Sequence, residues 1–191
     1  MKLILRDCAC VEELNAHVLK WVIILYIEPV YYCVVEEFRG LAVKLLILGP
    51  SFRRNSSNGV LPAIQRYDGL FYRIARKYLK EVRNVDVLVM KDNLTLVNAK
   101  TRLSYAPPKG QKWTGQSISE EDAEKARVSN EIVLSKKIKK GGYSEVFVAM
   151  GKKYAEALPD LLQYNVKVVF PTRGGIGPKA QVLKEWLSRG H

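Results

Sequence analysis

The stretch VKLLILGPS, residues 43–51, decides the fold, because a short apolar run ends there abruptly at Gly-Pro-Ser. Val43–Leu48 is rich in aliphatic side chains and apolar on both faces, as strands buried inside a parallel sheet are. The loop that follows turns basic at Arg53 and Arg54. The stretch therefore predicts a buried parallel strand whose carboxyl end opens into a positively charged loop.

The same succession of apolar run, loop and amphipathic helix repeats through the rest of the chain. We expect buried strands at Val43–Leu48, Val85–Met90, Glu145–Met150 and Val166–Phe170. We expect helices at Gly69–Val82, Ser119–Lys140, Lys152–Tyr164 and Pro178–Arg189, with Asp68 as the candidate N-cap of the first. Strands that alternate with helices indicate a parallel sheet covered on both faces. The predicted fold class is α/β, three-layer, with a mostly parallel sheet and helices on both faces.

Residues 1–42 form an apolar N-terminal extension ahead of a predicted single α/β domain, residues 43–191. The stretch WVIILYIEPVYYCVV, residues 21–35, is interrupted by Glu28 and Pro29 and is shorter than the roughly 20 residues of a membrane span. We therefore expect no membrane association and a cytoplasmic location. Pro29 divides the stretch into two strands, which form either a bent hairpin or an edge strand beside the main sheet. The alternative to native structure in residues 1–42 is an over-long gene model, in which the true start of the protein lies near Val43.

The charge of the chain is the main compositional signal of a partner. The whole chain has a net charge of +12, and residues 43–191 carry 27 basic and 13 acidic side chains, a net +14. Such an excess attracts nucleic acid or nucleotides through long-range electrostatics. The competing interpretation is that the basic side chains serve solubility and ion pairing alone.

Several kinds of chemistry are excluded by residue counts. Cys8, Cys10 and Cys33 all lie in the first 42 residues, so residues 43–191 contain no cysteine for a disulfide, a zinc site or a nucleophile. The same part of the chain has a single histidine, His191, which excludes Ser-His catalysis. Asp68 and Asp92 remain as candidate bases. We predict no cofactor and no metal, and the sequence leaves open whether the protein is an enzyme.

Ligands of open parallel sheets bind at the carboxyl ends of the strands, so the loops there carry the candidate sites. In the first loop, Gly49 permits close approach of a ligand, Ser51 offers a hydroxyl, and Arg53 and Arg54 offer guanidinium groups for phosphate. The loop lacks the Gly-Lys-Ser/Thr ending of a Walker loop. An ordinary Gly-Pro turn with solvated arginines is the alternative.

Two further candidates lie near the first helix and the second strand. Tyr67 is a candidate to stack on a base, and Asp68 is a candidate polar anchor or catalytic base, with Ser51 as the other catalytic candidate. Burial of the aromatic side chains in the core is the competing interpretation. Lys91 directly follows the second strand and is a candidate ligand contact.

The segment TRGGIGPK, residues 172–179, is the strongest single motif. Gly174, Gly175 and Gly177 come after a strand and before a helix, where glycine-rich turns present backbone amides to anions. Arg173 adds a positive charge beside them. The alternative is a glycine turn in a left-handed conformation that binds nothing.

Several stretches resemble a known family. PAIQRYDGLFYRIARKYL (62–79), VFVAMGKKYAEALPDLL (146–162) and PTRGGIGPKAQVLKEWL (171–187) resemble the uncharacterised α/β family related to the peroxide-stress protein YaaA and to the middle domain of archaeosine synthase, the archaeal tRNA-modifying enzyme. The resemblance implies a fold like that of uracil-DNA glycosylases and a role near nucleic acid or modified nucleobases. Ser51, Arg53, Tyr67 and the glycine turn match the family, whereas its loop cysteine is missing and the segment at Lys91 matches in part.

These observations predict a basic protein that binds nucleic acid or a nucleotide at the strand carboxyl ends. Action on a nucleobase in RNA or DNA, by modification or by glycosylase-like chemistry, is the enzymatic form of the prediction. The alternative is a non-enzymatic structural or interaction protein, such as a homodimer or a component of a ribonucleoprotein.

Overall fold

The computed structural model describes residues 21–27, 30–36, 43–80, 84–108 and 118–189. The chain divides into two compact units, Met1–Leu41 and Ala42–His191. In the first unit, β1 (Trp21–Ile27) pairs antiparallel with β2 (Val30–Glu36), from Trp21 opposite Glu36 to Ile27 opposite Val30. These two strands form a sheet of their own. Of the two predicted arrangements, the structure shows the hairpin.

The second unit is built on a five-stranded sheet with the order β6-β5-β3-β8-β9. The central strand is β3 (Val43–Leu48), and it pairs in parallel with β5 (Val85–Met90) and with β8 (Tyr143–Ala149). On the far side of β8 lies β9 (Lys167–Val169), also parallel, and β6 (Leu96–Asn98) is an antiparallel edge strand beside β5. The mostly parallel sheet predicted from the apolar runs is confirmed.

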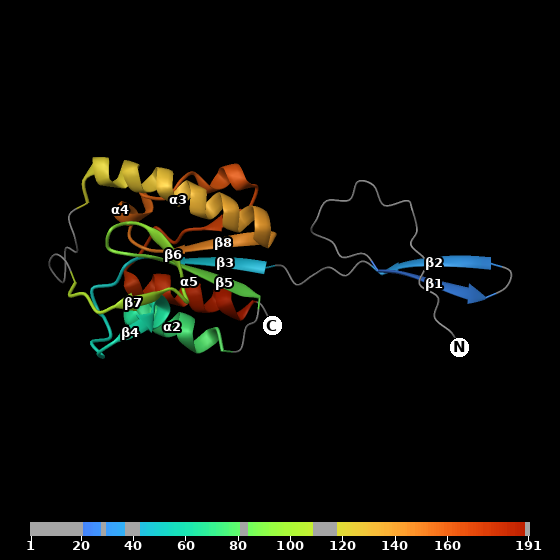
Figure 1. The fold of residues 1–191 in the computed structure, drawn as a ribbon, viewed down its shortest axis with the longest axis horizontal. Coiled ribbons are helices and arrows are strands. Elements are labelled where there is room, and N and C mark those ends of the chain that lie inside the picture. The colour runs from blue at the N-terminus through green and yellow to red at the C-terminus, as the bar shows by residue number, and fades with distance from the viewer. Residues whose placement is uncertain (1–20, 28–29, 37–42, 81–83, 109–117, 190–191) are drawn as a thin grey trace. The chain divides into compact units, whose positions relative to one another are not determined.

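Helices cover both faces of this sheet (Figure 1). One face packs against α3 (Glu120–Gly141), α4 (Lys152–Ala155) and the 3-10 helix Leu161–Tyr164, and the other against α1 (Ala63–Arg66), α2 (Leu70–Tyr78) and α5 (Ile176–Ser188). Successive residues of a strand point to opposite faces. Accordingly Leu45 and Ile47 lie in the core on the face covered by α3, and Leu46 and Leu48 lie in the core on the face covered by α2 and α5. The predicted three-layer α/β architecture is confirmed.

The boundaries of α3 follow from its capping residues. The Ser119 hydroxyl oxygen accepts a hydrogen bond of 3.0 Å from the Asp122 amide, and Gly142 ends the helix at φ 58°. The helix predicted at Lys152–Tyr164 is interrupted instead. Pro159 separates α4 from the 3-10 helix, because proline has no N–H to donate and disfavours helical backbone in the residue before it.

Two long connections of the α/β unit pair with each other. The segment after β3 contains β4 (Val60–Pro62), and the segment after β6 contains β7 (Arg102–Ser104). They form an antiparallel ribbon in which Leu61 lies opposite Leu103. Neither strand is predicted by the sequence. This ribbon gives the loops the fixed positions on which the candidate site depends.

Candidate nucleic-acid interface

The topological switch of the sheet lies between β3 and β8. After β3 the chain continues to helices on one face of the sheet, and after β8 it continues to helices on the other face. Gly49 and Met150 immediately follow these two strands. The Gly49 amide donates a 3.0 Å hydrogen bond to the Ala149 carbonyl, and a Cβ at Gly49 would lie 2.4 Å from the Met150 Cβ. The two backbones touch here, and the charged side chains that meet nearby, Arg54 and Asp92, follow β3 and β5.

Arg54 is the centre of this polar group. Its side chain is only 5% exposed and donates to the Asp92 carboxylate at 2.7 Å. It also donates to the Ala106 carbonyl, and to the Pro107 carbonyl at 3.2 Å. Asp92 follows β5, so a single guanidinium joins the loop after β3, the turn after β5 and the segment after β7.

Tyr67 lies against Arg54 and is 3% exposed. The Arg54 guanidinium lies 5.4 Å from the centre of the Tyr67 ring, and the Tyr72 ring lies 5.3 Å away. The Tyr67 hydroxyl donates to Asp92 at 3.4 Å, and burial raises the pKa of that hydroxyl. In this structure the ring is covered by protein and presents no open face to a base. Tyr67 instead holds Arg54 and Asp92 in place.

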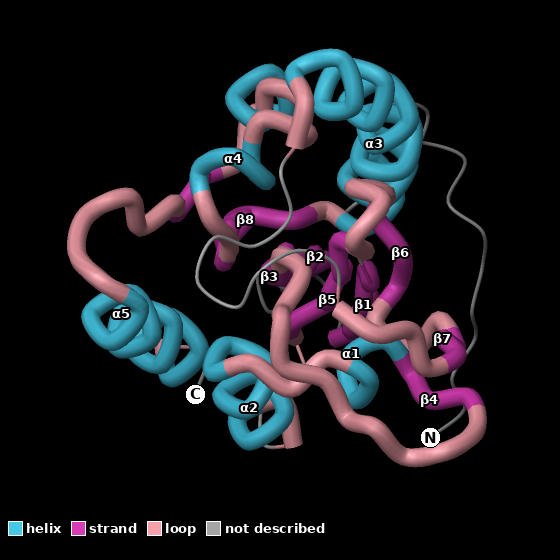
Figure 2. The backbone as a smooth tube through the Cα atoms, turned by 90° about the vertical axis from the view of Figure 1, so that its left-hand side faces the viewer, coloured by secondary structure: helices cyan, strands magenta, loops and turns pink. Residues whose placement is uncertain are grey.

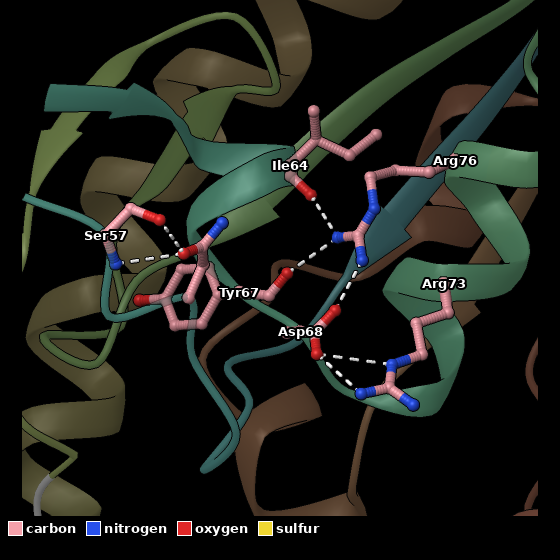
Figure 3. A network of polar contacts seen from close by, with 7 residues as sticks. Ser57, Ile64, Tyr67, Asp68, Arg73 and Arg76 are labelled. Carbon is pink, nitrogen blue, oxygen red and sulfur yellow. Dashed lines mark hydrogen bonds and ion pairs between the residues drawn. The ribbon is translucent and has the colours of Figure 1, made fainter.

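Asp68 forms a second ionic group with two arginines of α2 (Figure 3). Its carboxylate accepts hydrogen bonds from Arg73 at 2.6 Å and from Arg76 at 2.5 Å. The hydrogen bond from Arg73, followed by that from Arg76, lowers the pKa of Asp68. The structure does not use Asp68 as the N-cap of α2: that position is Gly69, without a side-chain hydrogen bond. Asp68 is a stable carboxylate and a weak base.

Arg66 fixes the loop that precedes β4. It is 2% exposed and donates to three carbonyls of that loop, those of Asn55 at 2.6 Å, Ser57 at 3.1 Å and Gly59 at 2.6 Å. A further hydrogen bond of 3.3 Å reaches the Leu103 carbonyl in β7. Because its donors are occupied by backbone oxygens, Arg66 shapes the site and does not contact a ligand.

An open hollow of about 530 Å³, here named the aromatic groove, lies beside Arg54. Two aromatic residues, two arginines and a proline line the groove: Phe52, Arg53, Arg54, Tyr105 and Pro108. Phe52 is 39% exposed and Tyr105 is 45% exposed. Arg53 is exposed and forms no ion pair among the described residues. The groove therefore offers two aromatic surfaces and one available guanidinium.

A second hollow of about 510 Å³, here named the polar hollow, shares Arg54 with the aromatic groove. Polar side chains line it throughout: Arg54, Asn55, Ser56, Gln65, Asp68 and Arg76. Sequence reasoning did not select Phe52, Tyr105 or Gln65. Phe52 next to Arg53 was an available signal, whereas nothing local to Tyr105 or Gln65 indicates that they meet the loop after β3.

The predicted site residues divide into groups. Arg53, Arg54, Tyr67 and Asp68 come together, and Ser51 lies beside them, since a Cβ at Gly69 would lie 2.4 Å from the Ser51 hydroxyl oxygen. Gly49 is at the base of this group, where its carbonyl accepts a 2.8 Å hydrogen bond from Tyr72. Lys91 opens the turn between β5 and β6, with its amide donating to the Thr95 carbonyl at 2.9 Å.

The glycine turn is not part of this group. Arg173, Gly174, Gly175 and Gly177 are exposed, and the turn leads from β9 into α5. Figure 2 shows this connection on the opposite side of the strand ends from β4 and β7. Among the described residues, no hydrogen bond or ion pair joins Arg173 to the loop that contains Arg53. The structure brings the first two predicted motifs together and leaves the third apart.

Comparisons of this chain with protein families, curated proteins and solved structures find no match. The resemblance to the YaaA-related family therefore stays a prediction. Within the described ranges, no helix has the length and apolar character required to cross a bilayer. The described residues also contain no group of three or more side chains suited to hold a metal ion.

Proposed function

We propose that the protein binds nucleic acid or nucleotides in the aromatic groove. The observation that carries this proposal is the exposure of Phe52 and Tyr105 in one hollow beside the available guanidinium of Arg53. Stacking of a base on an aromatic side chain contributes about 1–3 kcal/mol, and it suits every base because each has a π-face. Arginine contacts phosphate through two parallel N–H donors.

The charges around the groove favour an anionic ligand. Residues 43–191 have a net charge of +14, which attracts polyanions and accelerates their association. The carboxylates of Asp92 and Asp68 are neutralised, because Asp92 is paired with Arg54 and Asp68 with Arg73 and Arg76. A phosphate that approaches Arg53 is therefore not repelled by a free carboxylate among these residues.

Binding is better supported than catalysis. Asp68, the predicted base, is held by two arginines that lower its pKa, and a general base needs a pKa near the working pH. Ser51 lies near Gly69, and no hydrogen bond joins its hydroxyl to Asp68 among the described contacts. Base modification or glycosylase-like chemistry, a cytoplasmic location and a homodimeric or ribonucleoprotein role all stay predictions.

Fluorescence anisotropy with labelled single-stranded RNA and DNA tests the proposal. Affinity is expected to fall as salt rises, because phosphate contacts release counterions. Phe52→Ala is expected to weaken binding about tenfold, the equivalent of about 1.4 kcal/mol of lost stacking. Arg53→Gln is expected to weaken binding and to reduce the slope of log K against log salt by about 0.7.

Lys140→Gln is the matched control for charge. Lys140 is exposed in the last turn of α3, just before the amino end of β8, and its replacement removes the same charge as Arg53→Gln. Its effect on affinity is expected to be small. Binding that does not respond to salt, or an equal loss in Lys140→Gln and Arg53→Gln, would refute the proposed site.

A further inference from the structure

We infer that the site binds a single strand of nucleic acid across two consecutive nucleotides, one in the aromatic groove and the next in the polar hollow. The inference rests on the proposed function and names its ligand class. The two hollows share Arg54 as a common wall. Each has a volume inside the range of about 300–1,000 Å³ that is usual for small-ligand sites.

The segment 52–56 forms the ridge between the hollows, and the backbone holds it firmly. The Asp68 amide donates to the Arg53 carbonyl, and the Asn55 amide donates to the Arg66 carbonyl, both at 2.8 Å. Arg54 lies opposite Tyr67 in this antiparallel bridge. Four steps of extended chain at about 3.3 Å each give a span of up to about 13 Å from Phe52 to Ser56. Successive nucleotides are about 3.4 Å apart in a stacked strand and farther apart when their bases enter separate hollows, so a ridge of this length accommodates two.

The two hollows offer different contacts to a base. The aromatic groove presents the exposed rings of Phe52 and Tyr105, which suit the face of a base. The polar hollow presents groups that suit its hydrogen-bonding edge. Asp68 is an ionised acceptor there. The amide oxygen of Asn55 accepts from the Ser57 amide at 3.0 Å and from its hydroxyl at 2.6 Å, so the Asn55 NH₂ group is turned away from Ser57 as a donor.

Arg54 lies where the two nucleotides meet. Its Nε is buried and has no acceptor among the described residues, although buried donors are normally paired. The exposed Arg53 is adjacent on the same ridge and lines the aromatic groove. We assign the phosphate between the two nucleotides to Arg53. Arg54 is a positioning residue, because its three oxygen partners fix the guanidinium that lines both hollows.

Occupation of both hollows by one ligand predicts a step in affinity with ligand length. Linking two units makes the second contact intramolecular and raises the overall affinity. A 5′-phosphorylated dinucleotide is expected to bind at least about tenfold more tightly than a nucleoside 5′-diphosphate. Both ligands carry two phosphate groups, so the comparison measures the second nucleoside and not an additional phosphate. Competition against a labelled oligonucleotide measures both affinities.

A substitution in the polar hollow separates its contribution from that of the aromatic groove. Gln65 is exposed and makes no hydrogen bond among the described contacts, so Gln65→Glu is expected to fold normally. Its new carboxylate repels the second nucleotide, so dinucleotide affinity should fall to within about threefold of the nucleoside diphosphate. Phe52→Ala should weaken both ligands. Gln163→Glu, a change at an exposed position in the 3-10 helix, adds the same charge elsewhere. It should not change the ratio of dinucleotide affinity to nucleoside diphosphate affinity.

The possible outcomes distinguish the inference from the proposed function. Equal affinities for the dinucleotide and the nucleoside diphosphate would overturn the two-nucleotide site and leave nucleotide binding intact. Equal effects of Gln65→Glu and Gln163→Glu would overturn the assignment of the second nucleotide to the polar hollow. No binding of any of these ligands, or of the labelled oligonucleotide, would overturn the proposed function itself.

Discussion

Replacing Arg54 with methionine tests the interaction that holds the candidate site together. The substitution leaves the Asp92 carboxylate without the 2.7 Å contact to its cation and frees two carbonyls of the segment after β7. A hydrogen bond to a charged group contributes about 1.5–3 kcal/mol, and removal of one partner of a fully buried pair costs about 3–5 kcal/mol. The Asp92 side chain is 26% exposed, so water replaces part of the loss. We expect about 2–3 kcal/mol of lost stability.

Urea unfolding followed by circular dichroism, on Arg54→Met, Asp92→Asn and the double variant, measures this loss. Asp92→Asn removes the carboxylate that Arg54→Met leaves unpaired, so the double variant should be more stable than the sum of the single effects by about 1–2 kcal/mol. Additive effects within about 0.5 kcal/mol would show that the two side chains do not interact. A loss below about 0.5 kcal/mol in Arg54→Met would refute the role assigned to Arg54.

Three other predictions concern neighbouring parts of the fold. Asp68→Asn should destabilise the protein at pH 7, because the hydrogen bond from Arg73 chiefly lowers the pKa of folded Asp68 below its unfolded value of 3.8. The difference in stability between the two proteins should disappear as the pH falls from 3.8 through the pKa of the folded state, and urea unfolding at pH 7 and at a pH below that pKa measures it. Asn130→Leu should cost about 3–5 kcal/mol, measured by thermal unfolding, because this 1% exposed side chain hydrogen-bonds three backbone groups. Gly49→Ala should cost about 2–3 kcal/mol in urea unfolding, since the new Cβ meets the Met150 Cβ at 2.4 Å, and an unchanged midpoint would contradict the close packing of β3 and β8.

The elements of the α/β unit follow from local sequence patterns. Apart from Lys44, Val43–Leu48 is apolar on both faces and forms the central strand, because apolar side chains on both faces are buried only in a strand that is covered on both sides. Ser119 caps the start of α3 through its side-chain hydroxyl, and Gly142 ends the helix because glycine adopts a left-handed backbone conformation. Pro159 was a readable signal that the helix after Lys152 must end early.

The sequence by itself determined the layers of the molecule, because burial of apolar side chains repeats with the period of each element. Only the tertiary structure decided which loop residues meet. Arg54 reaches Asp92 across 38 positions of sequence, and Tyr105 approaches Arg66 at 5.7 Å. Neither contact leaves a periodic pattern. Whether an aromatic ring is covered, as in Tyr67, or exposed, as in Phe52, depends on what distant segments pack against it, and no local pattern contains that information.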